Sequence, residues 1–376
     1  MRIGIMLQSL HHLGGIGTYT QQVVKHLVSI DKKNEYILLY PTFGKAQQSF
    51  GQYRDYPNVT EVLSSSMVPH GHYWDHMVVP SVAKKYGVEM LFNPFQSIPL
   101  LGQFKKIPVI HNSEWFTMPD VFWMFERYTG RLRIKAIMKA ANLVISVSQK
   151  VAEDLMQATG LPAAKFRVIY NGASEAFKPM TDANVLDAMK QKFGLPDAFM
   201  LFVGGIYPQK NFIGMLKAFH AISHKIPHHL VVAGNTRWKS GHDLEWIGRL
   251  GIEKRVQLLG WVSHDDLAAI YNLATCFVIP SFHESCSVAL LEAISCGCPV
   301  IASRTGGNPE IVADAALLID PYDPLDLPQA LLEALSNTDL RQDLARKGLE
   351  RAKEFTWERC ATETLKVLDE CHAAGA

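Results

Sequence analysis

Short apolar runs alternate with longer segments whose apolar residues recur at helical spacing, along almost the whole chain. The runs have the length of buried strands, and the segments between them have the length of helices. This alternation predicts an α/β fold with parallel, doubly wound sheets, because consecutive parallel strands need a helical crossover between them. In the first half, the predicted strands are 2–7, 36–40, 59–63, 90–92, 109–111, 143–147 and 167–170, and the main helices are 18–29, 71–86, 120–141 and 149–159.

A polar stretch from 172 to 196 interrupts the alternation. It holds Pro179 and Pro196 around one short helical pattern, as interdomain linkers often do. A chain of 376 residues also exceeds what one core usually serves. We therefore predict two domains, 1–175 and 176–356. The second has strands at 199–203, 230–233, 256–259, 277–279, 300–302 and 317–319, helices at 211–224, 243–250, 264–273 and 288–296, and closing helices at 324–335, 338–354 and 357–372.

The stretch Ser281–Val300 carries the strongest candidate chemistry. Glu284 is predicted on a strand-to-helix loop, and Glu292 about one turn inside the following helix. Between them, the backbone N–H groups of Ser287 and Val288 are unpaired first-turn donors, which suit an anion. Either glutamate alone could be a solvated carboxylate. An anion site flanked by two carboxylates fits a nucleotide sugar, which has phosphates in the middle and hydroxyls at both ends.

Glycine-rich turns follow the first strand of each predicted domain. Gly14 and Gly15 lie in the run LGGIG, and Gly204 and Gly205 follow the strand 199–203. Glycine lets the backbone approach a phosphate or a sugar closely. The first run lacks the G-x-G-x-x-G spacing, and the second strand does not end in an acidic residue, so a dehydrogenase is disfavoured.

Two single side chains extend this candidate site. Lys210 follows the second glycine pair in the phrase PQKN, where its charge could neutralise a diphosphate. His111 ends a strand at the carboxyl edge of the first sheet, where ligands of such sheets bind. A surface lysine and a structural histidine are the alternatives.

The E-x7-E spacing, the phrase LLEAxxCGxPVIAS and the phrase GGNPEIV together resemble the donor-binding signature of retaining glycosyltransferases of family 4. The resemblance extends over nearly the whole chain. It implies the GT-B fold, in which two Rossmann-like domains face each other across a cleft. Domain 1–175 would bind the acceptor, domain 176–356 would bind the donor, and the last helix, 357–372, would pack back onto the first domain.

The resemblance also implies roles for individual residues. The catalytic set would be His111, Lys210 and Glu284, and the donor would be bound by Gly14, Gly15, Gly204, Gly205, Lys210, Val262, Glu284, Ser287, Val288 and Glu292. Four positions depart from the usual family pattern: Asn112 replaces an Asp after the His, Gly205 replaces an Arg, and Ser285 and Ser287 replace glycines. No Asp-x-Asp triplet occurs in the chain, so we expect no metal and no cofactor.

The implied activity is retaining transfer of a mannose-like or glucose-like sugar from a GDP or UDP donor, such as GDP-mannose or a UDP-sugar. The acceptor would be a glycan or a lipid-linked molecule in cell-surface polysaccharide synthesis, lipopolysaccharide included. A sugar-nucleotide 2-epimerase of the same architecture and a non-catalytic sugar-nucleotide binder are the alternatives. No nucleic-acid partner is expected.

Composition bears on the cellular location. All six cysteines lie in the second half, mostly in apolar runs, which is typical of reduced core thiols. The first residues lack the features of a signal peptide, and the chain has no apolar window of about 18 residues. We therefore expect a cytoplasmic protein.

The segment Val121–Lys139 combines aromatic and basic side chains, in the more basic half of the chain. Residues 1–175 hold 18 Lys and Arg against 12 Asp and Glu, whereas residues 176–376 hold 19 against 24. One interpretation is that Phe122, Trp123 and Phe125 are buried and the basic residues are solvated. The other is peripheral docking of this helix on the inner face of the membrane.

Overall fold

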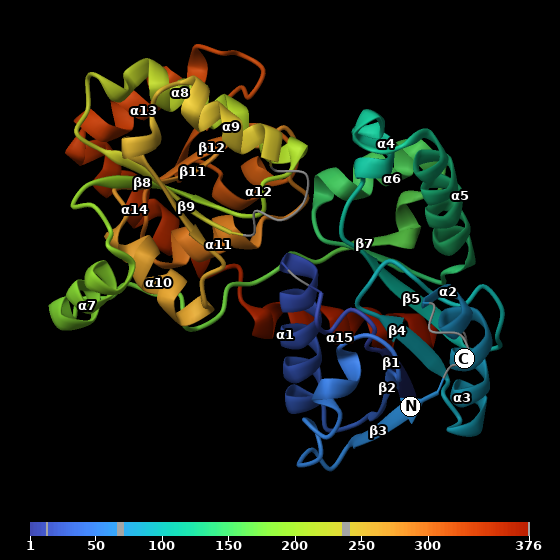
Figure 1. Cartoon of the computed structure of the whole chain (residues 1–376). Coiled ribbons are helices and arrows are strands. Elements are labelled where there is room, and N and C mark those ends of the chain that lie inside the picture. The colour runs from blue at the N-terminus through green and yellow to red at the C-terminus, as the bar shows by residue number, and fades with distance from the viewer. Residues whose placement is uncertain (13, 66–70, 235–240, 375–376) are drawn as a thin grey trace. The chain divides into compact units, whose positions relative to one another are not determined.

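The computed structural model describes residues 1–12, 14–65, 71–234 and 241–374, and Figure 1 labels its elements. The chain divides into two compact units. Unit 1 comprises Met1–Asn171 together with the C-terminal segment that begins at Trp357, and unit 2 comprises Gly172–Thr356. Each unit contains its own parallel sheet.

The strands of unit 1 are β1 (Arg2–Met6), β2 (Glu35–Pro41), β3 (Val59–Ser64), β4 (Met90–Asn93), β5 (Lys105–Ile110), β6 (Val144–Ser146) and β7 (Phe166–Val168). Its helices are α1 (Gly15–Ile30), α2 (Gly71–Tyr73), α3 (Val79–Lys85), α4 (Glu114–Thr117), α5 (Met124–Ala140), α6 (Gln149–Thr159) and α15 (Trp357–Ala373), with a π-helical turn η2 (Trp74–Val78) and 3-10 turns η1 (Ala46–Ser49), η3 (Pro119–Val121) and η4 (Ala163–Lys165).

Unit 1 is doubly wound. Its sheet has the order β3-β2-β1-β4-β5-β6-β7, so the chain reverses its direction of travel between β1 and β4. Side chains alternate between the two faces of each strand, and both faces of a parallel sheet must be covered. At one part of the sheet, Met6 and Leu39 pack with Trp74 of η2; at another, Ile110 packs with Ile134 of α5 and Leu155 of α6.

The last helix completes the core of unit 1. In Figure 1, α15 lies beside α1, and the two helices pack together. Trp357, only 2% exposed, meets Tyr19 of α1 edge to face, with ring centroids 5.9 Å apart. The Lys105 Nζ donates to the carbonyls of Cys371 and His372 at 2.6 and 2.8 Å, which fastens the end of α15 to the start of β5.

Unit 2 has the strands β8 (Phe199–Val203), β9 (His229–Ala233), β10 (Val256–Gly260), β11 (Cys276–Ile279), β12 (Val300–Ser303) and β13 (Ala316–Ile319). Its helices are α7 (Ala183–Phe193), α8 (Phe212–Ser223), α9 (Gly241–Arg249), α10 (His264–Leu273), α11 (Val288–Ser295), α12 (Asn308–Val312), α13 (Asp326–Ser336) and α14 (Thr338–Ala352), with 3-10 turns η5 (Pro208–Lys210) and η6 (Glu253–Arg255).

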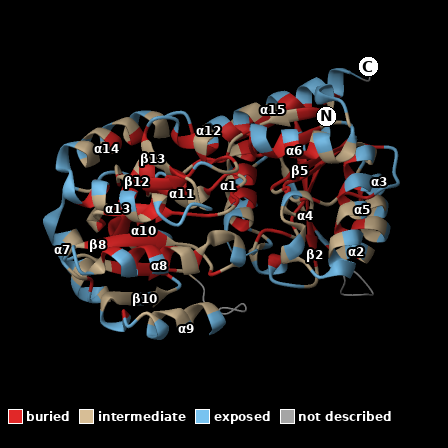
Figure 2. Cartoon of the chain, turned by 90° about the horizontal axis from the view of Figure 1, so that it is seen from above, coloured by how far each residue is buried: buried red, intermediate tan, exposed pale blue. Residues whose placement is uncertain are grey.

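The sheet of unit 2 has the order β10-β9-β8-β11-β12-β13 and reverses between β8 and β11. On one face, Phe202 packs with Phe219 of α8 and Leu331 of α13. On the other, the ring of Phe277 lies against Tyr271 of α10, with centroids 5.5 Å apart. Figure 2 shows the consequence in both units, where the inner strands are buried and the exposed residues lie mostly on helices, loops and the edge strands β3 and β10. The predicted α/β, doubly wound fold class is confirmed.

Several elements of the structure differ from the prediction. The strand predicted at 109–111 begins earlier, at Lys105, because two lysines and Pro108 conceal its apolar pattern. The helix predicted at 71–86 contains a π-helical turn, placed where Pro80 lacks the N–H that would bond the carbonyl of His76. The five-residue helix α12 was not predicted.

The helix predicted at 120–141 is also wrong at its start. The backbone of Phe122 and Trp123 is extended, and α5 begins at Met124. This break lets the ring of Phe122 stack on Trp115, with centroids 3.9 Å apart. The interpretation that Trp123 and Phe125 are buried is also wrong, because these residues are 72% and 79% exposed.

All six cysteines are buried and free of disulfides. Among the described helices, none combines the length and the apolar character that crossing a membrane requires.

Trp357→Ala should lower the free energy of unfolding of unit 1 by about 3–5 kcal/mol, because it leaves a cavity between α15 and α1. Urea denaturation followed by far-UV circular dichroism measures this. Trp123→Ala, at a 72% exposed position in the same unit, is the matched control. It should change the stability by less than about 0.5 kcal/mol; equal losses in the two variants would contradict the packing role of Trp357.

Candidate functional site

The carboxyl ends of the unit 2 strands form one edge of the sheet, and the candidate residues gather there. In open parallel sheets, ligands bind at this edge where the strand order reverses, because the loops on either side of the reversal diverge. In unit 2 the reversal lies between β8 and β11. Lys210 follows β8, and Glu284 follows β11. The two residues therefore occupy the two sides of the switch point.

Lys210 and Glu284 form an ion pair. The Lys210 Nζ lies 2.6 Å from Oε1 of Glu284, and the Ser281 Oγ donates to the same oxygen at 2.6 Å. Their side chains are 20% and 8% exposed, so neither is the solvated surface group that each could have been by itself. A charge pair shielded in this way interacts more strongly than one in water.

Backbone contacts fix the two loops relative to each other. The N–H of Phe282 donates to the carbonyl of Gln209 at 2.8 Å, and the Asn211 side chain donates to the carbonyl of Pro280 at 3.1 Å. Asn211 adopts a left-handed conformation (φ 53°), which Asn tolerates better than most residues. These bonds hold the lysine loop against the glutamate loop.

A third loop supports the backbone of Glu284. The N–H of Gly307 donates to the carbonyl of Glu284 at 2.8 Å, and Thr305 Oγ1 donates to the carbonyl of Ser281 at 3.0 Å. At Gly306 (φ 62°), an added Cβ would lie 2.0 Å from the Glu284 carbonyl oxygen. Only glycine fits there. From the sequence, Gly306 and Gly307 were noted only as part of the GGNPEIV motif, and no role was predicted for either of them.

The N-terminus of α11 lies between the two glutamates in sequence. Ser287 is its N-cap residue and accepts a hydrogen bond from the N–H of Leu290 at 3.4 Å. Within the described part of the chain, the backbone N–H groups of Ser287 and Val288 have no hydrogen-bond acceptor. First-turn N–H groups of this kind favour an anionic partner.

Glu292 is buried inside α11, with 5% exposure. The Tyr271 hydroxyl of α10 lies 3.3 Å from Oε2 of Glu292 and 3.1 Å from the carbonyl of Ala289. Burial raises the pKa of the Glu292 carboxyl to about 8, opposed by the Tyr271 hydrogen bond. At neutral pH this carboxyl therefore carries a proton, and it can donate one hydrogen bond as well as accept others. From the sequence, only its accepting role was expected.

Gly204 and Gly205 lie in the loop after β8, beside the end of β9. An added Cβ at Gly234 (φ 151°) would lie 2.0 Å from the carbonyl oxygen of Gly204, and the N–H of Gly234 donates to the carbonyl of Gly260 at 2.7 Å. Three strand ends thus meet through glycine backbones. Val262 is buried just beyond β10, at the same edge.

In unit 1, the predicted residues lie at the carboxyl edge of the other sheet. His111 follows β5, is buried, and its Nε2 lies 2.7 Å from the carbonyl oxygen of Pro94, which follows β4. Burial lowers the His111 pKa to about 4, so the ring is neutral at pH 7. Nε2 then donates to Pro94, and Nδ1 is left as an acceptor. The ring meets Tyr19 edge to face at 4.7 Å.

The glycines before α1 have different roles. Gly14 is the N-cap residue with φ 89°, a conformation that favours glycine, and both Gly14 and Gly15 are exposed. Gly17 was not singled out from the sequence, yet an added Cβ there would lie 1.9 Å from the carbonyl oxygen of His12. The third glycine of the GGIG run is therefore the one that packing requires.

Solved structures share this architecture over the full chain. The sucrose-phosphate synthase of Thermosynechococcus elongatus superposes with a TM-score of 0.78 at 19% identity, covering 100% of both chains. The Anabaena protein HepE, solved in complex with UDP-glucose, superposes with a TM-score of 0.78 at 19% identity, covering 98% of this chain and 100% of its own. At these identities, the likeness establishes the fold.

Two family models match successive parts of the sequence. Residues 13–177 match "Glycosyltransferase Family 4", and residues 187–351 match "Glycosyl transferases group 1". The chain is a GT-B glycosyltransferase. A curated relative of this glycosyltransferase, the "O-antigen chain mannosyltransferase B" of Escherichia coli, is 28% identical over 273 residues, which are 70% of this chain and 70% of the relative.

The glycosyltransferase thus gathers its unit 2 residues at one sheet edge and brings Lys210 and Glu284 into direct contact. Ser281, Thr305, Gly306 and Tyr271 support them and were missed. Ser281 lies three residues before Glu284, a local signal that could have been used. Tyr271 comes from another helix, and only the tertiary structure identifies it.

Glu292→Gln should flatten the pH dependence of stability. The folded carboxyl has a raised pKa of about 8, against 4.5 for the ordinary group, so the folded state binds the extra proton between these values. The contribution of this carboxyl to the free energy of unfolding is complete below the unfolded pKa of 4.5. It is lost as the pH rises towards the folded pKa of about 8, at about 1 kcal/mol per pH unit. Thermal melts from about pH 5 to about pH 8 measure the slope. If the slope is the same in Glu292→Gln and in the unsubstituted protein, the buried proton is refuted.

Proposed function

We propose that the protein is a retaining, metal-independent glycosyltransferase that moves a sugar from a nucleoside diphosphate donor to a glycan or lipid-linked acceptor. The Lys210–Glu284 pair at the switch point of unit 2 carries this proposal, because it places a cation and a carboxylate side by side where a charged, hydroxylated ligand binds.

Lys210 and the α11 N-terminus would hold the diphosphate. Negative charge grows on the leaving diphosphate as the glycosidic bond breaks, so groups that stabilise it act mainly in the transition state. Lys210 supplies a full positive charge, and the N–H groups of Ser287 and Val288 supply partial ones. A diphosphate that attracts Lys210 would also free Glu284 to bind a sugar hydroxyl.

Glu292 would bind the ribose. A diol presents two hydroxyls, each able to donate and to accept. The protonated Glu292 carboxyl matches it, with one O–H donor and free acceptor lone pairs. Gly204, Gly205 and Val262 would line the same edge, where strand ends joined through glycine let the nucleotide approach the backbone.

Unit 1 would supply the acceptor side. Its carboxyl edge carries Gly14, Gly15 and His111, and the neutral His111 can accept a hydrogen bond at Nδ1 from a sugar or acceptor hydroxyl. Among the site residues in the described part of the chain, we assign no nucleophile to the opposite face of the sugar. The acceptor hydroxyl would then attack on the face that the diphosphate leaves, which retains the anomeric configuration.

The names of related proteins indicate the donor class. The Escherichia coli relative is a mannosyltransferase, and HepE was solved with UDP-glucose. We infer a mannose-like or glucose-like sugar carried by GDP or UDP, used in cell-surface polysaccharide synthesis such as that of lipopolysaccharide O-antigen. Sugar nucleotides are made in the cytosol, and we place the enzyme there.

Lys210→Ala should lower kcat by about tenfold or more while changing the donor dissociation constant less, because the charge that Lys210 meets develops in the transition state. Turnover of GDP-mannose and UDP-glucose, with nucleoside diphosphate binding by calorimetry, separates the two effects. Lys225→Ala, which replaces an exposed lysine just beyond the end of α8, is the matched control. Similar kcat values for Lys210→Ala and Lys225→Ala would reject the assignment of Lys210.

The same turnover assay also tests metal independence and the two alternative functions. Activity should persist in excess chelator, and loss that manganese or magnesium restores would contradict metal independence. Donor incubated without acceptor should yield no epimer; an epimer would indicate the 2-epimerase instead. Nucleotide binding with no turnover on any glycan or lipid-linked acceptor would leave a non-catalytic binder.

Peripheral membrane contact is the further part of this proposal, and α5 would make it. Met124, Phe125, Tyr128 and Leu132 recur at spacings that place them on one side of α5, and each is 61% to 79% exposed. The opposite side is buried through Ile134, among others. Farther along the exposed side lie two exposed lysines, Lys135 and Lys139. An amphipathic helix with aromatic residues and lysines is suited to an anionic lipid surface.

Trp123→Ser combined with Phe125→Ser should abolish co-flotation of the protein with anionic liposomes at low salt, because both exposed rings lose their contact with the interface. Leu101→Ser is the control, at a position of the same unit that is 79% exposed but not on α5. Vesicles of neutral lipid should bind less, since each nearby lysine contributes about 1 kcal/mol at an anionic surface. Docking by α5 is ruled out if the double variant floats as well as Leu101→Ser.

A further inference from the structure

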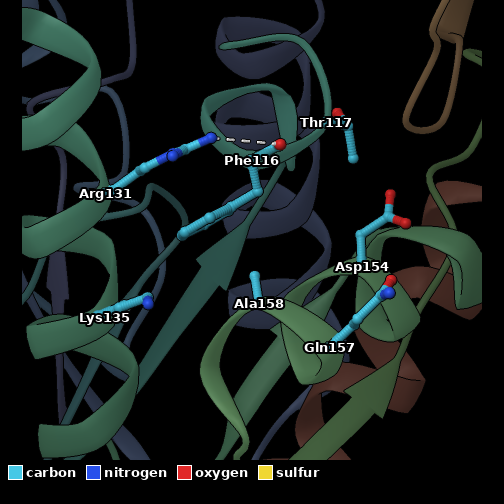
Figure 3. A pocket seen from close by; sticks show the side chains of 7 residues that line it. All are labelled: Phe116, Thr117, Arg131, Lys135, Asp154, Gln157 and Ala158. Carbon is cyan, nitrogen blue, oxygen red and sulfur yellow. Dashed lines mark hydrogen bonds between the residues drawn. The ribbon is translucent and has the colours of Figure 1, made fainter.

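A pocket of about 450 Å³ lies in unit 1 between α4, α5 and α6, and none of the predicted catalytic or donor-binding residues lines it. Figure 3 shows Arg131 and Lys135 extending from α5 on one side, with Asp154 and Gln157 of α6 on the other. The ring of Phe116 lies between them. The volume falls within the range of small-ligand sites, about 300–1,000 Å³.

The spacing of the lining residues explains the pocket. Arg131 and Lys135 are four residues apart on α5, and Asp154 and Ala158 are four apart on α6, so each pair lies on one side of its helix. The short α4 lies over the gap and contributes Phe116 and Thr117. Two facing helices and one crossing turn thus form the walls.

The charges in the pocket do not cancel one another. Asp154 is buried, and its carboxylate is already bound by Lys150 at 2.5 Å and by the Ser113 hydroxyl at 2.8 Å. Within the described residues, neither Arg131 nor Lys135 has a carboxylate partner within ion-pair distance. The pocket therefore presents two uncompensated cations.

Phe116 supplies a flat apolar surface between these cations. The Arg131 guanidinium lies 5.8 Å from the ring centroid and the Lys135 Nζ lies 6.0 Å from it, both within cation–π range. Arg131 is further fixed by donating from Nε to the carbonyl of Trp115 at 2.6 Å. A ring with cations beside it and with Thr117 and Gln157 nearby matches a sugar that bears a negative group.

We propose that this pocket binds a sugar carrying a phosphate or a carboxylate group. The anionic group would contact Arg131 and Lys135, and the sugar ring would lie on Phe116 with its hydroxyls near Gln157. Assigning this sugar to the acceptor rests on the proposed glycosyl transfer, whereas its binding does not.

Saturation-transfer NMR on the full chain tests the pocket with glucose 6-phosphate, glucuronate and neutral glucose. At least one of the two anionic sugars should bind about tenfold more tightly than glucose, and added salt should weaken its binding. Whichever anionic sugar binds better identifies the preferred anion. Equal binding of all three sugars would overturn the proposal.

Lys135→Ala should weaken binding of the preferred sugar by about five- to tenfold, because one charge-assisted contact is lost. Lys139→Ala, one helical turn farther along α5 and outside the pocket lining, is the matched control and should bind normally. Gln157→Glu, at an exposed position, adds a negative charge and should weaken binding at least as much as Lys135→Ala. Unchanged binding in Lys135→Ala and Gln157→Glu would remove the sugar from this pocket.

Nucleoside diphosphate titrated into the unsubstituted protein separates the two proposals. If the nucleotide binds and neither anionic sugar does, the pocket proposal fails and the donor site stands. If an anionic sugar binds and neither GDP nor UDP does, the pocket stands and the proposed transferase function fails.

Discussion

The Lys210–Glu284 ion pair is the interaction around which unit 2 is arranged. Removing two charges from water is costly, and a partly buried pair gives little net stability unless further bonds satisfy it. Here Ser281 donates to the shared carboxylate oxygen, and the loop at Gly306 holds the Glu284 backbone. Hydrophobic residues can often replace such a pair without loss of stability. The bonds that support Lys210 and Glu284 are therefore better explained by ligand binding than by a contribution to folding.

The sheet topology determines which residues can take part in this pair. Lys210 and Glu284 are 74 positions apart, yet they follow neighbouring strands because the strand order reverses between β8 and β11. The crossovers that follow these two strands lead away from each other along the sheet. Unit 1 has the equivalent reversal between β1 and β4, and Gly14 and Pro94 follow those two strands.

Local sequence patterns predicted most of the fold and the outline of the site. Apolar spacing placed Glu284 in a loop and Glu292 in a helix, as the structure has them. The burial of Glu292 and its raised pKa were not predicted, because they depend on α10 packing over α11. The start of β5 was missed for a local reason, since Pro108 and two lysines are unusual in a central strand. The exposure of Trp123 and Phe125 depends on the break before α5, where Phe122 stacks on Trp115.

Arg131 shows why residue type alone could not assign the basic helix. As a basic residue of α5 it resembles Lys139, but its Nε donates to the carbonyl of Trp115, and it lines a pocket together with Lys135. Lys139 lies exposed on the same helix and outside that lining. Two basic residues of one helix thus have different environments, and the difference depends on how α4 packs against α5.

The packing of α15 on α1 has a consequence for biosynthesis. Unit 1 is built from the first 171 residues and from the last helix, with all of unit 2 between them in the chain. On the ribosome, unit 2 is therefore complete before Trp357 exists to cover Tyr19. Throughout that interval, the apolar side of α1 lacks its cover. The nascent protein must therefore pass through a state in which unit 1 is incomplete and the apolar side of α1 is uncovered, the kind of exposure that chaperones protect.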